Sequence, residues 1–293
     1  MTATTGITIG RILFPVEFHE KSVGIFGVAA GIARRFHSEL LFLHVKSHEE
    51  SAGTNDPSRW PGTNGDLVSQ FVRYADTELH QQIGVELNGL NLRSVTRQGE
   101  PAREIAAAAR EQAADLIVMP TRSYRGFYQY LIESVTAEVM HETDRPVLAA
   151  AHLDALPKEL TVKRVLCGVT FSEHSQTVLK CAGRIAREFG AKLTIAHVTP
   201  DVEMYGPGGD YVDQPWKEEL VLSAKELVAK LQQHTGVEGD FAFESGDAGA
   251  GLNRIAQQVG ADVLVAGCHD SGGHFGTNSY GILAESRIPV LSL

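Results

Sequence analysis

The sequence predicts two α/β domains in tandem, each built on a doubly wound parallel sheet. Two observations predict this fold class: the halves of the 293-residue chain resemble each other, and short apolar runs alternate with amphipathic segments in both halves. Continuous apolar strands that alternate with helices are typical of parallel sheets covered on both faces. Right-handed crossovers make such a sheet doubly wound. The length suits two domains of about 150 residues each.

The internal repeat consists of matching segments that follow one another in the same order. Residues 11–16 (RILFPV) match residues 164–169 (RVLCGV), with a separation of 153 residues. Further matches are 32–36 with 185–189, 44–45 with 197–198, 114–115 with 261–262, and 145–148 with 288–291. The separation falls to 147 and then to 143 residues, which indicates a duplication with changes in loop length. We therefore expect a first domain over 1–151, a linker over 152–162 and a second domain over 163–293.

The strands and helices of each half follow from hydrophobic periodicity. Strands are expected at 12–16, 40–45, 92–97, 116–119 and 147–150, and in the second half at 165–169, 193–198, 240–244, 263–266 and 290–293. Helices are expected at 22–36, 66–87, 101–113 and 134–142, and in the second half at 175–189, 215–235, 250–259 and 281–286.

His44 and His197 occupy equivalent strand positions, and each is expected to be a hydrogen-bonded histidine near a strand end, with a proton-transfer group as the alternative.

Composition narrows the classes of function. The net charge of −10 disfavours binding to nucleic acid or to anionic membranes, which require a basic face. No apolar run approaches the roughly 20 residues that span a bilayer, and residues 1–10 lack the pattern of a signal peptide. The three cysteines, Cys167, Cys181 and Cys268, are an odd number and do not indicate a disulfide framework. We therefore expect a cytoplasmic protein.

Short motifs in both halves carry a family resemblance. In the first half they are RILFPVE (11–17), LHV (43–45), GEP (99–101), ADLIVM (114–119), SV (134–135) and RPVL (145–148). In the second half they are RVLCGV (164–169), AHV (196–198), ADVLVAG (261–267), GT (276–277) and IPVL (288–291). On these motifs each half resembles a universal stress protein domain, and the chain resembles a tandem member of that family.

The resemblance implies a Rossmann-like fold of the adenine nucleotide alpha hydrolase type and an adenine nucleotide as ligand. It also implies that the two halves pair within one chain through their last strands, at 147–150 and 290–293. The residues leave open whether two chains associate as a homodimer, and a protein partner remains an alternative.

The resemblance further implies a nucleotide site at the carboxyl ends of the strands. In family members that bind ATP, an aspartate follows the first strand, and a loop with the pattern Gly-x2-Gly-x9-Gly-Ser/Thr follows the fourth. In the second half Thr170 stands at the aspartate position, and the loop is shorter than the pattern by four residues; it carries Gly267, Asp270, Gly272, Gly273, Gly276 and Thr277. Glycines let backbone amides approach a phosphate, and the hydroxyl residue opens a helix whose N-terminus favours an anion. Val169 and Val198 are expected beside the adenine, although each also fits an ordinary strand core.

The first half departs further from the family pattern. Glu17 stands at the aspartate position, Pro120 and Ser123 replace the glycines, and Glu133 precedes Ser134. Proline removes an amide donor, and Glu133 brings a negative charge to the phosphate position. Ser134 is either a phosphate contact or a plain helix N-cap. We therefore expect the second half to bind the nucleotide.

Taken together, the residues and the resemblance predict a stress-response protein that binds ATP or AMP as a switch, with at most slow ATPase activity. Mg²⁺ is expected to accompany ATP and to bridge Asp270 and the phosphates. The alternative is an adaptor that holds a protein or an apolar ligand through the two loops. Residue types that can bind zinc cluster in the second loop, at Cys268, His269, Asp270 and His274, but their spacing matches no zinc pattern, and a polar loop is favoured. No catalytic residue is assigned.

Overall fold

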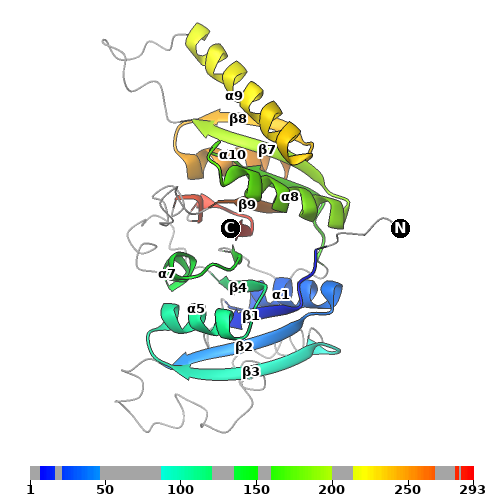
Figure 1. Ribbon diagram of the computed structural model, residues 1–293, viewed down its shortest axis with the longest axis vertical. Coiled ribbons are helices and arrows are strands. Elements are labelled where there is room, and N and C mark those ends of the chain that lie inside the picture. The colour runs from blue at the N-terminus through cyan, green and yellow to red at the C-terminus, as the bar shows by residue number, and fades with distance from the viewer. Residues whose placement is uncertain are drawn as a thin grey trace. The chain divides into compact units, whose positions relative to one another are not determined.

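Two compact units make up the protein, seen here in a computed structural model (Figure 1). The structure describes residues 7–16, 22–46, 87–120, 135–150, 160–199, 214–267, 281–283 and 285–293. The first unit takes in the described residues from Thr8 to Leu160, and the second takes in Ile7 and those from Thr161 to Leu293. In the part of the chain that the structure describes, no helix combines the length and the apolar character needed to cross a membrane.

The first unit contains a parallel five-stranded sheet with the order β3-β2-β1-β4-β5. Its strands are β1 (Arg11–Pro15), β2 (Glu39–Lys46), β3 (Asn91–Gln98), β4 (Leu116–Pro120) and β5 (Val147–Ala150). The helices of this unit are α1 (Ser22–Phe36), α5 (Pro101–Glu111) and α7 (Val135–Glu142).

The second unit repeats this topology with the order β8-β7-β6-β9-β10, again parallel throughout. Its strands are β6 (Arg164–Gly168), β7 (Lys192–Thr199), β8 (Asp240–Ser245), β9 (Val263–Ala266) and β10 (Val290–Ser292). Its helices are α8 (Ser175–Phe189), α9 (Gln214–Thr235) and α10 (Ala248–Val259). Residues 281–283 and 285 are also helical. The predicted fold class, two doubly wound α/β domains in tandem, is confirmed.

The helices of the second unit cover both faces of its sheet (Figure 1). A β-carbon at Gly168 would meet Leu252 of α10 at 3.2 Å, so this position of β6 faces α10. Gly168 pairs with Ala266 of β9, and side chains alternate along a strand. The next position, Gly267, therefore faces the other way, where a β-carbon would meet Val178 of α8 at 3.2 Å. Helices α8 and α10 thus lie on opposite faces, and α9 packs against α8.

The two units fill the same core layer with different side chains. In the first unit Phe14 of β1, Phe26 of α1 and Phe42 of β2 are fully buried, and each ring contacts the other two with centroids 5.6–5.9 Å apart. The residues 153 positions later are Cys167 in β6, Leu179 in α8 and Ile195 in β7, which are also fully buried. The layer is therefore aromatic in one unit and small or aliphatic in the other.

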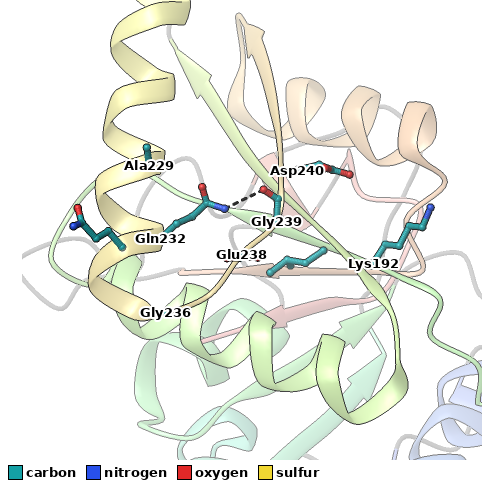
Figure 2. Close-up of a pocket in the computed structure, with 9 residues that line it drawn as sticks. Lys192, Ala229, Gln232, Gly236, Glu238, Gly239 and Asp240 are labelled. Carbon is teal, nitrogen blue, oxygen red and sulfur yellow. Dashed lines mark hydrogen bonds between the residues drawn. The ribbon is translucent and has the colours of Figure 1, made fainter.

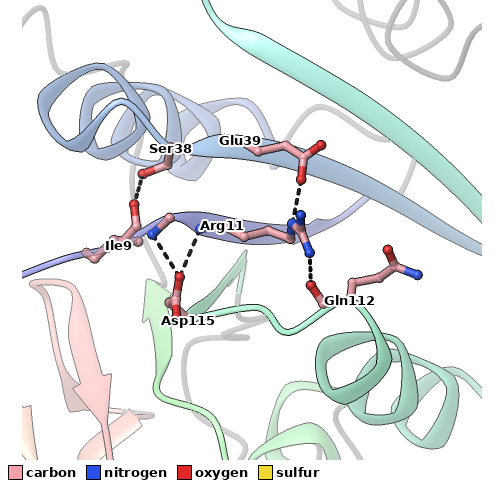
Figure 3. Close-up of polar contacts among 7 residues, drawn as sticks. Ile9, Arg11, Ser38, Glu39, Gln112 and Asp115 are labelled. Atoms are coloured by element: carbon pink, nitrogen blue, oxygen red, sulfur yellow. Dashed lines mark hydrogen bonds and ion pairs between the residues drawn. The ribbon is translucent and has the colours of Figure 1, made fainter.

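Both units fix the start of their first strand with an aspartate. In the first unit one carboxylate oxygen of Asp115 accepts hydrogen bonds from the backbone N–H groups of Gly10 and Arg11, at 2.8 and 3.0 Å (Figure 3). The Arg11 guanidinium pairs with Glu39 and donates to the backbone carbonyl of Gln112, just after α5 (Figure 3). These contacts tie the starts of β1, β2 and β4 together at the amino ends of the strands.

Asp262 has the equivalent role in the second unit. Its carboxylate accepts from the backbone N–H groups of Lys163 and Arg164, at 2.6 and 2.8 Å. The Arg164 guanidinium donates to the carbonyl of Gly260, just after α10. The matched sequence pairs 114–115 and 261–262 thus have a structural role in the scaffold.

Several expected elements lie outside the described residues or differ from them at their ends. The helix expected at 66–87 falls outside them except at Leu87, and so does Ser134 of the expected helix 134–142. Helix α5 ends at Glu111 rather than at residue 113, because Gln112 is its C-cap and Ala113 adopts a left-handed φ of 50°. Helix α10 begins at Ala248 rather than at residue 250, because the Asp247 side chain caps it by accepting from the Ala250 N–H at 2.9 Å.

Candidate nucleotide site

The candidate site lies where the strand order of the second unit reverses. Chain connections leave β6 toward β7 on one side, and β9 lies on its other side. Val169 and Thr170 directly follow β6, Gly267 directly follows β9, and Val198 lies near the end of β7. The four predicted site residues that the structure describes therefore lie at the carboxyl ends of three adjacent strands.

The remaining predicted site residues lie outside the described residues. They are Glu17 and Ser134 in the first unit and Asp270, Gly272, Gly273, Gly276 and Thr277 in the second. The zinc alternative, Cys268, His269, Asp270 and His274, also lies outside them. Among the residues that are described, no group of three or more histidine, cysteine or acidic side chains is arranged to hold a metal ion.

Val169 and Val198 point to opposite faces of the sheet. A β-carbon at Gly251 of α10 would lie 2.7 Å from the Val198 side chain, so Val198 faces α10. Val169 follows Gly168, which also faces α10, and therefore points toward the α8 face. A ligand that contacts both valines has to cross the end of the sheet rather than lie on one face of it.

Thr170 is exposed to solvent two residues after the end of β6. Its hydroxyl oxygen lies 3.1 Å from that of Ser172, close enough for a hydrogen bond in which either group donates. The main chain just before it is held in the sheet, because the Val169 N–H donates to the Ala196 carbonyl at 2.9 Å. Thr170 thus offers a neutral hydroxyl pair where the family pattern has a carboxylate.

His197 contacts both neighbours of Thr170. Its Nδ1 lies 2.9 Å from the carbonyl oxygen of Val169, and because a carbonyl only accepts, Nδ1 carries the proton. Its ring lies against the Phe171 ring, with centroids 4.3 Å apart. The expectation of a hydrogen-bonded histidine near the strand end is confirmed for His197. Burial lowers the pKa of this imidazole, and the hydrogen bond to Val169 partly opposes that effect.

Phe171 is a site residue that sequence reasoning missed. It has a φ of 61°, in the left-handed region that bulky L-residues rarely adopt. Its ring contacts a series of aromatic side chains that crosses from His197 of β7 to Phe243 of β8 at 6.2 Å and then runs along β8 to Phe241 at 6.4 Å. The alternating phenylalanines of β8 are the signal in the sequence that predicts such a series.

Gly267 lies tightly against the start of α8. A β-carbon here would sit 2.7 Å from Cδ2 of His174, the residue that precedes α8. Nε2 of His174 lies 3.2 Å from the carbonyl oxygen of Leu293, and the Leu293 N–H donates to the Ala266 carbonyl. Packing against His174 is therefore a sufficient reason for a glycine at this position, independent of any phosphate.

The backbone of the first turn of α10 packs directly against the backbone of the helical segment that starts at Gly281. A β-carbon at Gly249 would lie 2.4 Å from the carbonyl carbon and oxygen of Gly281. The Asp247 carboxylate oxygens would lie 3.9 Å from a β-carbon at Gly281. This contact holds the chain at the point where it leaves the glycine-rich segment.

The two described cysteines of this unit are free thiols, Cys167 buried and Cys181 partly exposed. Burial raises the pKa of Cys181 to about 11 and raises that of Cys167 as well. A raised pKa favours the protonated thiol, which is a poor nucleophile.

An open groove of about 870 Å³ lies at the other end of the same sheet (Figure 2). It runs between the end of α9 and the amino ends of β7 and β8, and the Gln232 amide donates to the Gly239 carbonyl there at 3.0 Å. The charged side chains of Lys192, Glu238 and Asp240 spread along it rather than converging on one point (Figure 2). The groove is therefore separate from the candidate nucleotide site.

The doubly wound parallel sheet, present once in each unit, defines a tandem protein with a Rossmann-like α/β fold. The model of the universal stress protein family matches residues 8–150 and 161–292, and the chain belongs to this family. Universal stress protein MJ0531 of Methanocaldococcus jannaschii is 26% identical over 140 residues, which cover 47% of this chain and 79% of that protein.

Solved structures agree with the tandem fold. The crystal structure of a universal stress protein from Archaeoglobus fulgidus matches with a TM-score of 0.66 and 22% identity, and the match covers 97% of this chain and 96% of that one. A functionally unknown protein from Pseudomonas aeruginosa PAO1 matches with a TM-score of 0.62 and 18% identity, covering 97% and 92%. At these identities the likeness concerns the fold alone.

Proposed function

We propose that the second unit binds an adenine nucleotide, ATP or AMP, and that the protein acts in the stress response as a nucleotide-dependent switch. The observation that supports this proposal is the position of Thr170 and Gly267, which follow the neighbouring strands β6 and β9 at the strand-order reversal. Ligands of doubly wound sheets bind outside the carboxyl ends of the strands at this point. The glycine-rich segment 267–277 begins there, and glycines let backbone amides approach a phosphate.

The proposal assigns adenine contacts to Val169 and Val198 and the ribose end to Thr170. Asp270 is assigned to Mg²⁺ when the ligand is ATP, because its charge repels phosphate unless a divalent ion lies between them. Efficient hydrolysis requires concentrated positive charge on the phosphates, and residues 267–280 contain neither lysine nor arginine. The activity proposed is therefore binding, with turnover below about 1 s⁻¹. The pairing of the two halves through their last strands and the cytoplasmic location stay predictions.

The first experiment asks whether nucleotide accompanies the protein. The purified chain is denatured and the released small molecules are identified by mass spectrometry, and binding of AMP and ATP is then measured by calorimetry with and without a chelator. One adenine nucleotide per chain, or saturable binding at one site, supports the proposal. Release of none, together with no calorimetric binding, overturns it in favour of the adaptor.

Two matched variants test which unit binds. Gly276→Asp adds a negative charge and a side chain to the proposed phosphate segment, and we expect it to abolish binding. Ser134→Asp adds a negative charge to the equivalent segment of the first unit, and we expect little effect. The reverse result assigns the site to the first unit.

Asp270→Ala is expected to remove the dependence of ATP affinity on Mg²⁺.

A further inference from the structure

One imidazole contacts the residues on both sides of Thr170. On the preceding side, His197 Nδ1–H donates to the carbonyl oxygen of Val169 at 2.9 Å. On the following side, the His197 ring contacts the Phe171 ring at a centroid separation of 4.3 Å and an interplanar angle of 41°. Thr170 itself is exposed at the end of β6. Its position is thus set by its two neighbours and, through them, by a residue of β7.

The backbone at Phe171 needs such support. A φ of 61° lies in the left-handed region, where the β-carbon of an L-residue is crowded, and a strained conformation persists only where its surroundings hold it. The main chain turns sharply here, which carries Ser172 back to within 3.1 Å of Thr170 as measured between their hydroxyl oxygens. The contact with His197 is the described interaction of the Phe171 ring.

The imidazole is in turn held in place by the sheet. His197 pairs with Phe243 in the register of β7 and β8, and the two rings are 6.2 Å apart. The hydrogen bond to Val169 fixes the tautomer with the proton on Nδ1. The ring therefore has a defined orientation before any ligand arrives, which is the condition for a site to be preorganised.

We propose that His197 is a positioning residue of the nucleotide site, which fixes the Thr170–Ser172 hydroxyl pair by holding Val169 and Phe171. This inference rests on the proposed function for the ligand, but the contacts that define it belong to the protein alone. The chemistry presented by the pair is a neutral donor and acceptor for the ribose end of a nucleotide.

The test combines binding with local order. His197→Leu removes the donor and the aromatic ring, and we expect AMP to bind about three- to tenfold more weakly, the worth of one net hydrogen bond. His197→Asn keeps an N–H donor near the position of Nδ1, and we expect it to recover part of that loss. In hydrogen exchange, the amides of residues 170–172 are expected to exchange faster in His197→Leu than in the wild type, with the core strands unchanged.

The equivalent histidine provides a matched control. His44 is the corresponding residue of β2 in the first unit and is buried there. His44→Leu is expected to lower stability but to leave AMP affinity within about twofold of the wild type. If His197→Leu does not fold, Phe171→Gly replaces it. Glycine adopts the left-handed φ without strain, and loss of the ring contact is expected to loosen residues 170–172 in the same way.

The outcomes separate this inference from the proposed function. Wild-type affinity together with unchanged exchange at residues 170–172 in His197→Leu overturns the positioning role. Failure of the wild type to bind AMP or ATP overturns the proposed function, and the exchange experiment then decides the role of His197 by itself. A loss of affinity in His44→Leu equal to that in His197→Leu shows a general effect of stability and also overturns the inference.

Discussion

The α-carbon of Gly267 faces the His174 ring so closely that a β-carbon there would lie 2.7 Å from Cδ2. We predict that Gly267→Ala destabilises the second unit by about 1–3 kcal/mol, the range for overpacking a close contact. The double variant Gly267→Ala/His174→Ala is expected to regain part of this free energy, since the obstructing atom belongs to a side chain. Denaturant titration of the wild type, Gly267→Ala, His174→Ala and the double variant measures the coupling free energy. If the changes in unfolding free energy of the two single variants add up to that of the double variant, the two residues do not compete for space.

The contact between Gly249 and Gly281 is more restrictive, because both partners are backbone. A β-carbon at Gly249 would lie 2.4 Å from the Gly281 carbonyl group, and no rotamer change relieves that overlap. We predict that Gly249→Ala costs at least about 3 kcal/mol or prevents folding of the second unit. Gly281→Ala is the matched control, since a β-carbon there would lie 3.9 Å from the Asp247 carboxylate, an ordinary van der Waals contact. Equal unfolding midpoints for the two variants would contradict this prediction.

The Asp262 carboxylate is predicted to stabilise the second unit through the two backbone N–H groups that it accepts. Asp262→Ala removes both hydrogen bonds, and we expect a loss of about 1–2 kcal/mol in the free energy of unfolding, reduced from the usual worth of two charged bonds by solvent. Asp115→Ala is expected to do the same in the first unit. Asp240→Ala removes an exposed carboxylate at the start of β8 and should change stability by less than about 0.5 kcal/mol. Similar losses of unfolding free energy in all three variants would show that removing any of these carboxylates has the same general effect.

Stability is predicted to fall in mild acid through His197. Burial lowers the pKa of this residue below its ordinary value of 6.5, so the unfolded chain binds more protons than the folded one as the pH falls. Its contribution is therefore complete above the unfolded-state pKa and is lost as the pH falls from about 6.5 toward the folded-state pKa. We expect the free energy of unfolding to decline less steeply between about pH 7 and pH 5 in His197→Asn than in the wild type. Parallel curves would indicate that His197 titrates alike in both states.

Much of the scaffold could be predicted from the sequence because its signals are local. Helices α1 and α8 have the predicted bounds, and α8 ends where Gly190 takes a left-handed φ of 64°. Strand ends differ by a residue or so, since ladder hydrogen bonds extend into polar residues such as Glu39 and Lys46, which hydrophobicity does not mark. The expected fold class required only the alternation of elements and the order of the repeat.

The candidate site was harder to predict because its geometry depends on contacts between elements. Val198 faces α10, and Val169 points to the other face of the sheet. This arrangement follows from strand register, which local patterns do not specify. The left-handed backbone of Phe171 has no local signal, since the residue is neither glycine nor asparagine. Gly267 carries a packing constraint from His174, 93 positions away in the sequence, which a motif comparison interprets only as a phosphate contact.

The buried layer formed by Phe14, Phe26 and Phe42 constrains how the two halves can be recombined. Its counterparts are Cys167, Leu179 and Ile195, and all six side chains are fully buried. Each interior is fitted to its own set of side chains, and moving one residue from one copy to the other would leave either a void or an overlap. A hybrid gene with a crossover between β1 and β2 would combine side chains from both sets and would encode a mismatched interior.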